Sequence, residues 1–377
     1  NNLCLRSLVR FWDTATNQEI ALQTYYGSVK ALEFGPDSRY IFLGGCDQWD
    51  ENFICTKGVV HIWDTQSDEG ITTLELGEYV TNLSISPDNH ILVAAGCKNY
   101  NRQTRYCTGN TLGIWKVGSW EKLEEIEGLS ASVISFSPDG KYFVSKDIKD
   151  DKEIIQVMYA TNLAIMEKLS YDDYVKKAEF SLNNALLFTL SDKELDVWNA
   201  KSWNKIATIR HAYKVDVAAF SDDNKSIVTV GCDSEELVFC SKYKIVLWNA
   251  ETGKEIAHTY HTDSVNQVLF TSDNRLLLYG SADGSVTVWD FDTNEKITQM
   301  NYGDGRILQI SFSSDKRYVI SVSSNKSYRT LLYRPEDLIA DACTRLNRNL
   351  TLAEWEQYIG ASLSYEPTCP NLPIPEE

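Results

Sequence analysis

Residues 261–290, HTDSVNQVLFTSDNRLLLYGSADGSVTVWD, decide the fold of this chain. They divide into three apolar segments, 264–270, 275–279 and 286–289, which are separated by polar turns. The segments are rich in β-branched, aliphatic and aromatic residues, and the turns carry Ser, Asp, Asn and Gly, so the pattern predicts three short strands. A further turn precedes a fourth expected strand at 296–300.

The same pattern recurs along the chain with three markers in phase. The third segment of each copy ends at an anchor residue: Trp12, Trp63, Trp115, Met158, Trp198, Trp248, Trp289 and Tyr333. An aromatic residue or Ile follows each of the first seven anchors by 21–23 positions and opens a turn: Phe34, Ile85, Phe136, Phe180, Phe220, Phe270 and Phe312. An apolar residue lies seven or eight positions after each of the same seven anchors: Ile20, Ile71, Leu123, Ile165, Ile206, Ile256 and Ile297. Such agreement predicts a repeat architecture.

One four-stranded sheet of this length cannot bury both of its faces alone, but seven sheets packed around an axis can. We therefore expect an all-β fold, a seven-bladed β-propeller of four-stranded antiparallel blades, followed by a short C-terminal helical tail. A solenoid of strand pairs is the structural alternative. The turns divide each repeat into four strands, which favours the propeller.

At this point the chain resembles the WD-repeat β-propeller family, from about Leu8 to Tyr333. The resemblance is closest in 261–290, where His261, Asp283 and Trp289 match the hydrogen-bonded network of that family. It implies structural roles for these residues and for the other tryptophan anchors: Trp12, Trp63, Trp115, Trp198 and Trp248. The Gly-His pair of the family is mostly missing elsewhere, and the five histidines are expected to fall in different phases of the repeat.

The markers divide the chain into three parts. Residues 1–18 are expected to be a residual strand from an upstream blade or domain, 19–334 the propeller, and 335–377 a helical and Pro-rich tail packed on it. Residues 19–24 are expected to pair with the last sheet and close the ring. That leaves the strand at 8–12 surplus, either as an irregular segment or, as we favour, as part of a blade that begins upstream.

The tail resembles the closing segment of bacterial multidomain proteins in which WD-repeat propellers follow signalling ATPases, kinases or caspase-like proteases. This resemblance implies an upstream signalling domain in the same chain.

Three repeats carry an insert between their second and third strands, and two cysteines bracket each insert. The pairs are Cys46 with Cys55, Cys97 with Cys107, and Cys232 with Cys240, while the tail holds Cys343 and Cys369. Two thiols across a hairpin stem are within reach of a disulfide. Reduced thiols packed as small hydrophobic groups and a metal site are the alternatives, although the spacing is too long for a zinc knuckle. The expected compartment is cytoplasmic, or extracytoplasmic if the paired cysteines are disulfides.

Composition and motifs argue against several classes of function. The net charge is −17, which disfavours binding to nucleic acid or an anionic membrane but permits a basic protein partner. No phosphate-binding loop, His-Glu-x-x-His motif or nucleophile elbow occurs in the sequence. We therefore expect no enzyme activity, no cofactor and no metal.

Tyr, Trp and Arg residues are concentrated where the inserts and the starts of the first strands are expected to form a rim. The candidate partner-binding residues are Tyr26, Tyr79, Tyr174, Tyr213, Lys214, Arg306, Trp49, Tyr100 and Arg102. Such side chains are common contact anchors for proteins, although tyrosines there also serve to cover the edge of a core.

These features predict a non-catalytic protein–protein recognition platform. Its expected place is the sensor or autoinhibitory domain of a larger bacterial signalling or defence protein. An oligomerisation scaffold and a small-molecule hydrolase using the central channel are the alternatives.

Overall fold

The structure is a computed structural model that describes residues 7–13, 18–25, 27–52, 54–67, 69–101, 106–107, 109–149, 152–236, 239–301, 303, 305–313, 316–325, 327–360, 362 and 364–375. The chain forms two compact units, Asn1–Tyr260 and His261–Glu377, which are described separately. None of the helices in these described ranges is long and apolar enough to cross a membrane.

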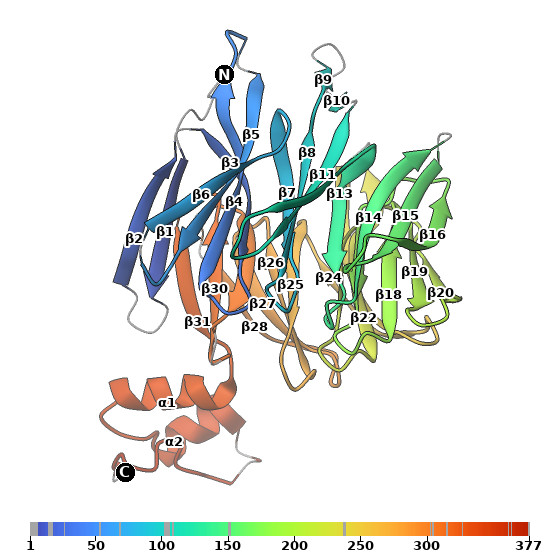
Figure 1. The fold of residues 1–377 in the computed structure, drawn as a ribbon. Coiled ribbons are helices and arrows are strands. Elements are labelled where there is room, and N and C mark those ends of the chain that lie inside the picture. Colours follow the sequence, from blue (N-terminus) through green and yellow to red (C-terminus); the bar gives the residue numbers. More distant parts are fainter. Residues whose placement is uncertain are drawn as a thin grey trace. The chain divides into compact units, whose positions relative to one another are not determined.

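The first unit is built from short antiparallel strands (Figure 1). They are β1(Ser7–Asp13), β2(Gln18–Tyr25), β3(Ser28–Phe34), β4(Tyr40–Trp49), β5(Cys55–Asp64), β6(Glu69–Glu75), β7(Tyr79–Ile85), β8(Ile91–Cys97), β9(Tyr100–Asn101), β10(Tyr106–Cys107), β11(Asn110–Lys116), β12(Lys122–Glu127), β13(Leu129–Phe136), β14(Tyr142–Lys149), β15(Lys152–Tyr159), β16(Ile165–Tyr171), β17(Lys177–Phe180), β18(Leu186–Leu190), β19(Glu194–Asn199), β20(Lys205–Arg210), β21(Val215–Phe220), β22(Ser226–Glu236), β23(Phe239–Asn249) and β24(Glu255–His261), which ends at the unit boundary.

The second unit continues the pattern and ends in helices. Its elements are β25(Val265–Phe270), β26(Leu276–Ser281), β27(Ser285–Asp290), β28(Glu295–Asn301), β29(Ile307–Phe312), β30(Tyr318–Ser323), β31(Tyr328–Leu332), α1(Pro335–Arg345), α2(Leu352–Trp355) and the π-helical turn η1(Glu356–Gly360).

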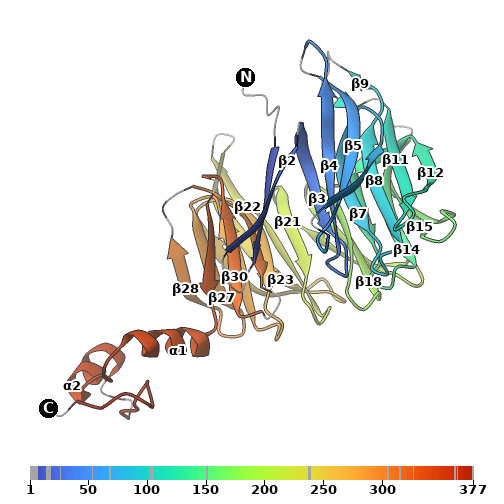
Figure 2. The ribbon, with the colours of Figure 1, turned by 60° about the vertical axis from the view of Figure 1, so that its left-hand side comes forward.

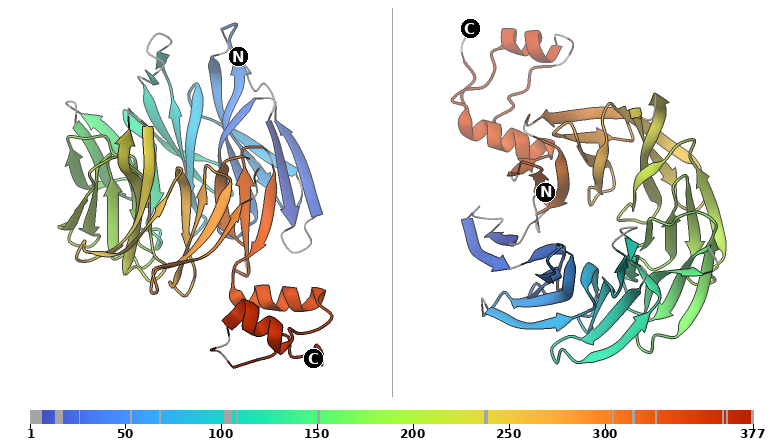
Figure 3. Two further views of the ribbon diagram at one scale, coloured as in Figure 1. Left: turned by 180° about the vertical axis from the view of Figure 1, so that it is seen from behind. Right: turned by 90° about the horizontal axis from the view of Figure 1, so that it is seen from above.

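The strands form the repeated four-stranded sheets that the markers predict. The sheets β3–β6, β13–β16, β17–β20, β21–β24 and β25–β28 each run in chain order, and the second repeat has the order β12-β11-β8-β7 with its insert strands β9 and β10 paired separately. In the first unit these sheets follow one another in chain order, from blue through cyan to green (Figure 3). This all-β arrangement of sheets fits a propeller, with three strands described in its last sheet, β29–β31.

The strands at the N-terminus pair with each other. β1 and β2 form a two-stranded sheet whose register shifts between Phe11 and Trp12, as it does between third and fourth strands elsewhere. The fourth strand expected in the last sheet is therefore paired with the surplus third strand. The division of the chain at residues 18 and 334 stays a prediction.

A β-bulge explains the third sequence marker. In the pairing of third with fourth strands, the register shifts at the anchor residue, and one residue of the fourth strand has no opposite partner. The residues in this position are Ile71, Leu123, Ile206 and Ile297, and they are 40–50% exposed. In the sheet anchored by Met158 the extra residue is Met166, one position after the expected Ile165.

Neighbouring sheets are packed through apolar faces and joined by polar side chains in, or immediately before, their first strands. The buried cluster around Phe42, Leu83 and Trp115 joins the first two four-stranded sheets. Lys176 Nζ donates to the carbonyl oxygen of Val215 at 2.6 Å in the next sheet. In the second unit Asn266, the corresponding residue, donates to the carbonyl oxygen of Ile307 at 2.6 Å.

The tail contains a helix cap and an ion pair of its own. Thr351 and Glu354 form the expected capping box at the start of α2. Arg348 binds Glu354 at 2.7 Å and lowers the pKa of that carboxyl to about 2. The apolar face of α1 is partly solvated, with Leu338 and Ile339 41% and 44% exposed. That the tail covers an apolar surface of the propeller stays a prediction.

Candidate protein-interaction surface

Each insert begins where the second strand passes the start of the first strand in the same sheet. Cys46 pairs with Ser28, and Cys97 pairs with Tyr79. In the third such sheet the amide of Cys232 donates to the carbonyl oxygen of Lys214 at 3.0 Å. The inserts and the residues that lead into the first strands therefore share one face of the first unit. We call this the insert face.

A glycine before the first cysteine of each insert allows this close approach. A Cβ on Gly45 would overlap the carbonyl oxygen of Ser28, and a Cβ on Gly231 would lie 2.6 Å from that of Lys214. A Cβ on Gly96 would lie 2.9 Å from the carbonyl oxygen of Tyr79. The glycine of each Gly-Cys pair is thus required because the backbone at the start of the first strand passes directly over it. This close approach fixes the position of the residue at the start of that strand.

We expect Gly45→Ala to lower the free energy of unfolding by about 1–3 kcal/mol, because the added methyl must displace the backbone at Ser28. Chemical denaturation measures the change. Gly70→Ala is the matched control, since the nearest atoms to its Cβ are 3.8 Å away on Trp63. Equal stability of the two variants would contradict the close approach.

The cysteine pairs that bracket the inserts lie at disulfide distance. The structure joins Cys46 to Cys55, Cys97 to Cys107, Cys232 to Cys240 and, in the tail, Cys343 to Cys369, with Cα–Cα distances of 5.5–5.9 Å. Among the residues that the structure describes, no group of three or more His, Cys, Asp or Glu side chains could hold a metal ion. Of the three cysteine alternatives, the geometry favours disulfides.

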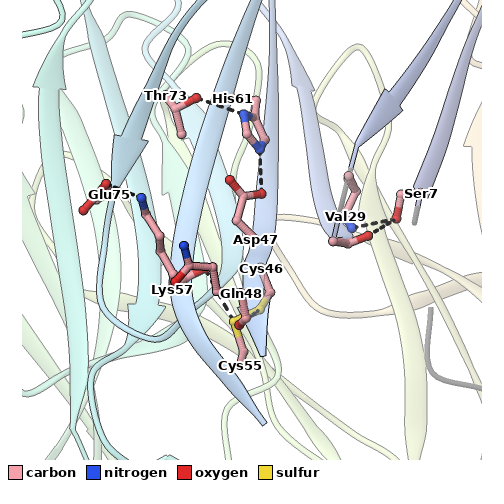
Figure 4. A network of polar contacts seen from close by, with 11 residues as sticks. Ser7, Val29, Cys46, Asp47, Gln48, Cys55, Lys57, His61, Thr73 and Glu75 are labelled. Atoms are coloured by element: carbon pink, nitrogen blue, oxygen red, sulfur yellow. Dashed lines mark hydrogen bonds and ion pairs between the residues drawn. A yellow bond between two sulfur atoms is a disulfide. The ribbon is translucent and has the colours of Figure 1, made fainter. Parts of the chain in front are cut away.

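The first insert is braced by a polar network that the sequence did not predict (Figure 4). Asp47 is the extra residue of a bulge beside Cys46, and its carboxylate lies 2.8 Å from Nε2 of His61. The other ring nitrogen of His61 lies 3.0 Å from Thr73 Oγ1 on β6. The ring of Tyr25 is 5.0 Å from that of His61, and burial raises the pKa of Tyr25 to about 12.

At the tip of the first insert, the side chain of Asp50 binds two backbone amides. Asp50 Oδ1 accepts hydrogen bonds from the amides of Asn52 and Ile54, both at 2.9 Å. The β4–β5 hairpin and the β9–β10 pair extend beyond the neighbouring strands at the same edge of the first unit (Figure 2). These hairpins therefore form raised, stapled margins of the insert face.

Several predicted contact residues lie on or beside this face. Tyr174 is 51% exposed, Lys214 is exposed, and Tyr79, Tyr213 and Trp49 are half-buried. The ring of Tyr174 covers the ammonium group of Lys146, with Nζ 3.8 Å from the ring centre.

The remaining predicted contact residues are not brought to this surface by the described structure. Arg306 is exposed and belongs to the second unit. Tyr26 and Arg102 lie outside the described residues, and for Tyr100 the backbone alone is described.

The residues expected to be structural are placed as follows. His261 is 5% exposed, and its Nε2 lies 3.1 Å from Asp283 Oδ2. Trp289 and Trp115 are 0% and 2% exposed. Trp63, Trp198 and Trp248 are half-buried, and the side chain of Trp12 lies outside the described residues.

The expectation that the five histidines differ in phase is wrong for two of them. His211 and His261 each lie four residues before the first residue of a first strand, Val215 and Val265. The ring of His211 packs edge-on against Trp248 at 5.5 Å, and the ring of His261 packs edge-on against Tyr279 at 5.5 Å. The sequence already holds this signal, because His211 lies 13 residues after the anchor Trp198 and His261 lies 13 residues after the anchor Trp248.

Burial lowers the pKa of His211 from its ordinary 6.5 to about 4. The unfolded chain then binds more protons than the folded one between these values, so stability is lost as the pH falls through this window. We expect His211→Phe to reduce the stability difference between pH 7 and pH 4.5 by roughly 2–3 kcal/mol. Denaturation curves at both pH values measure it, and exposed His90→Gln is the control. An unchanged difference in His211→Phe would contradict the assignment.

One repeat matches a known family. Residues 253–290 match the family described as WD domain, G-beta repeat. No curated protein matches the chain. The matched residues contain the stretch with the clearest strand pattern, and together with the repeated four-stranded sheets this match fits a WD-repeat propeller.

Proposed function

We propose that this chain is a non-catalytic recognition platform that binds a protein or peptide across the insert face of its first unit. WD40 repeats generally mediate protein–protein interaction. The observation that carries the proposal is the register that brings each stapled insert beside a strand-leading residue, Tyr79 and Lys214 among them. Aromatic and cationic side chains held by such a rigid frame are typical contact anchors.

The partner is a basic segment of a protein. Beside Tyr174, the carboxylate of Asp172 is 88% exposed and Asp173 is also exposed. Lys152 binds Asp172 at 3.2 Å, but a surface ion pair of this kind contributes little and exchanges readily with an incoming cation. The net charge of −17 gives such a partner a favourable approach.

The expected setting is a sensor or autoinhibitory domain of a larger bacterial signalling or defence protein, with the signalling domain upstream in the same chain. The resemblance of the tail to the closing segment of such proteins supports this setting.

Affinity purification with the intact chain, followed by measurement of Kd for the purified partner, tests the proposal. Tyr79→Ala with Tyr174→Ala is expected to weaken binding at least tenfold, as the loss of two aromatic anchors does at protein interfaces. Tyr358→Ala is the control, because Tyr358 is 69% exposed on the tail. Unchanged affinity in the double variant would remove the insert face from the proposal.

A further inference from the structure

The first strand of the fourth repeat is held differently from those of the first, second and fifth repeats. Val29, Val80 and Val215 each pair with a glycine of their own second strand. Pairing in β17 begins only at Lys177, two residues after the corresponding Val175. The amide and the carbonyl oxygen of Val175 are bound by side chains of the preceding sheet, and the amide of Lys176 donates to the carbonyl oxygen of Leu190 in β18 at 2.7 Å.

Two charged side chains of that sheet bind Val175. Its amide donates to Glu153 Oε2 at 3.2 Å, and its carbonyl oxygen accepts from Lys146 Nζ at 3.4 Å. Lys146 and Glu153 form an ion pair of 2.8 Å between β14 and β15, with their side chains 1% and 12% exposed. A buried pair of this kind is fixed in geometry, since each lost contact would leave a desolvated charge.

The same ammonium group also holds Tyr174. Lys146 Nζ lies 3.8 Å from the centre of the ring, within the range of a cation–π interaction. The three contacts of the ammonium group are therefore a carboxylate, a carbonyl oxygen and an aromatic face. One side of the Tyr174 ring is occupied by the cation, while half of the side chain remains exposed.

We infer that Lys146 and Glu153 are positioning residues, which preset Tyr174 as a fixed aromatic anchor for the partner. This inference rests on the proposed function of the insert face. An exposed tyrosine loses side-chain and loop freedom when a partner binds it, and that loss weakens binding. Here the freedom is already removed before the partner arrives, because the ring and the following residue are both bound to the buried ion pair.

The double variant Lys146→Met with Glu153→Leu tests the inference. Replacing both charges by apolar groups of similar size avoids a buried unpaired charge, so the fold is expected to persist. A fluorotyrosine placed at position 174 reports the ring by ¹⁹F NMR. We expect its signal to move and narrow, and the affinity for the purified partner to fall on the order of tenfold through lost preorganisation.

Matched variants separate this role from a general effect on stability. Lys242→Met removes an ammonium group whose Nζ lies 3.5 Å from the centre of the Tyr260 ring, and it should leave the signal at position 174 unchanged. Lys146→Arg keeps a cation at the Tyr174 ring, so this variant should retain most of the affinity for the partner.

The outcomes distinguish the inference from the proposal on which it rests. An unchanged ¹⁹F signal and affinity in Lys146→Met with Glu153→Leu, while Tyr174→Ala still weakens binding, would overturn the positioning role alone. If Tyr174→Ala leaves the affinity unchanged, the anchor itself is lost, and the inference falls with it. A displaced ¹⁹F signal combined with weakened binding in a folded double variant supports it.

Discussion

Replacing Trp289 by alanine is expected to lower the free energy of unfolding by about 3–5 kcal/mol, the usual cost of removing a buried indole. Trp289 is 0% exposed at the end of β27, opposite Leu277, and its ring lies 6.2 Å from that of Phe291. The loss combines the transfer of the ring from the core with the cavity that remains. Thermal or chemical denaturation measures it.

Ile297→Ala is the control for this variant. Ile297 lies one residue past the pairing partner of Trp289, in the bulge, and is 43% exposed. It should cost less than about 1 kcal/mol, because less apolar area leaves water when the chain folds. If the two variants lose the same stability, Trp289 is not a core anchor of its sheet.

Reduction of the disulfides is expected to have the second large effect. The three insert disulfides span 8–10 residues, and chain entropy assigns each about 2–3 kcal/mol as an upper estimate. All three lie in the first unit, so a reductant should shift the denaturation of that unit most strongly. Denaturation curves with and without reductant measure the shift.

Titration of thiols in the unfolded chain without reductant is the direct check. If the four pairs are disulfides, the nine cysteines leave one thiol expected to react, that of Cys4, which lies outside the described residues. Nine free thiols would contradict the pairing. Replacing Cys97 and Cys107 together by serine should remove only the stability that the disulfide of the second insert contributes, because the other three pairs are unaffected.

The repeat could be predicted because its markers have local causes. The anchors lie at the ends of third strands, and the apolar residue eight positions after Trp63, Trp115, Trp198 and Trp289 is the extra residue of a bulge, so both recur at fixed spacing. The pairing of the bracketing cysteines could also be predicted, because the two strands of a hairpin stem lie side by side. The Gly-Cys pair carries the same information, because the strand that crosses Gly45 needs the space that a side chain would fill.

The polar contacts between sheets could not be predicted in the same way. Lys146 and Val175 are 29 residues apart and belong to different repeats, and nothing in the local sequence marks Lys146 as buried. In the sequence, Asp47 resembles a solvated turn residue. In the structure, the bulge places its carboxylate beside the ring of His61. Such contacts depend on how neighbouring strands and sheets pack. The repeat period and the turn residues predict only the strands within a single sheet.

Hydrogen–deuterium exchange of the complex between the intact chain and its purified partner tests the central claim most directly. Recognition across the insert face predicts protection of amides in the insert hairpin 46–55 and in the strand-leading segments 77–80, 172–176 and 211–215. Protection confined to the turns between first and second strands, such as 35–38 and 86–89, or to the tail at 335–375, would contradict it.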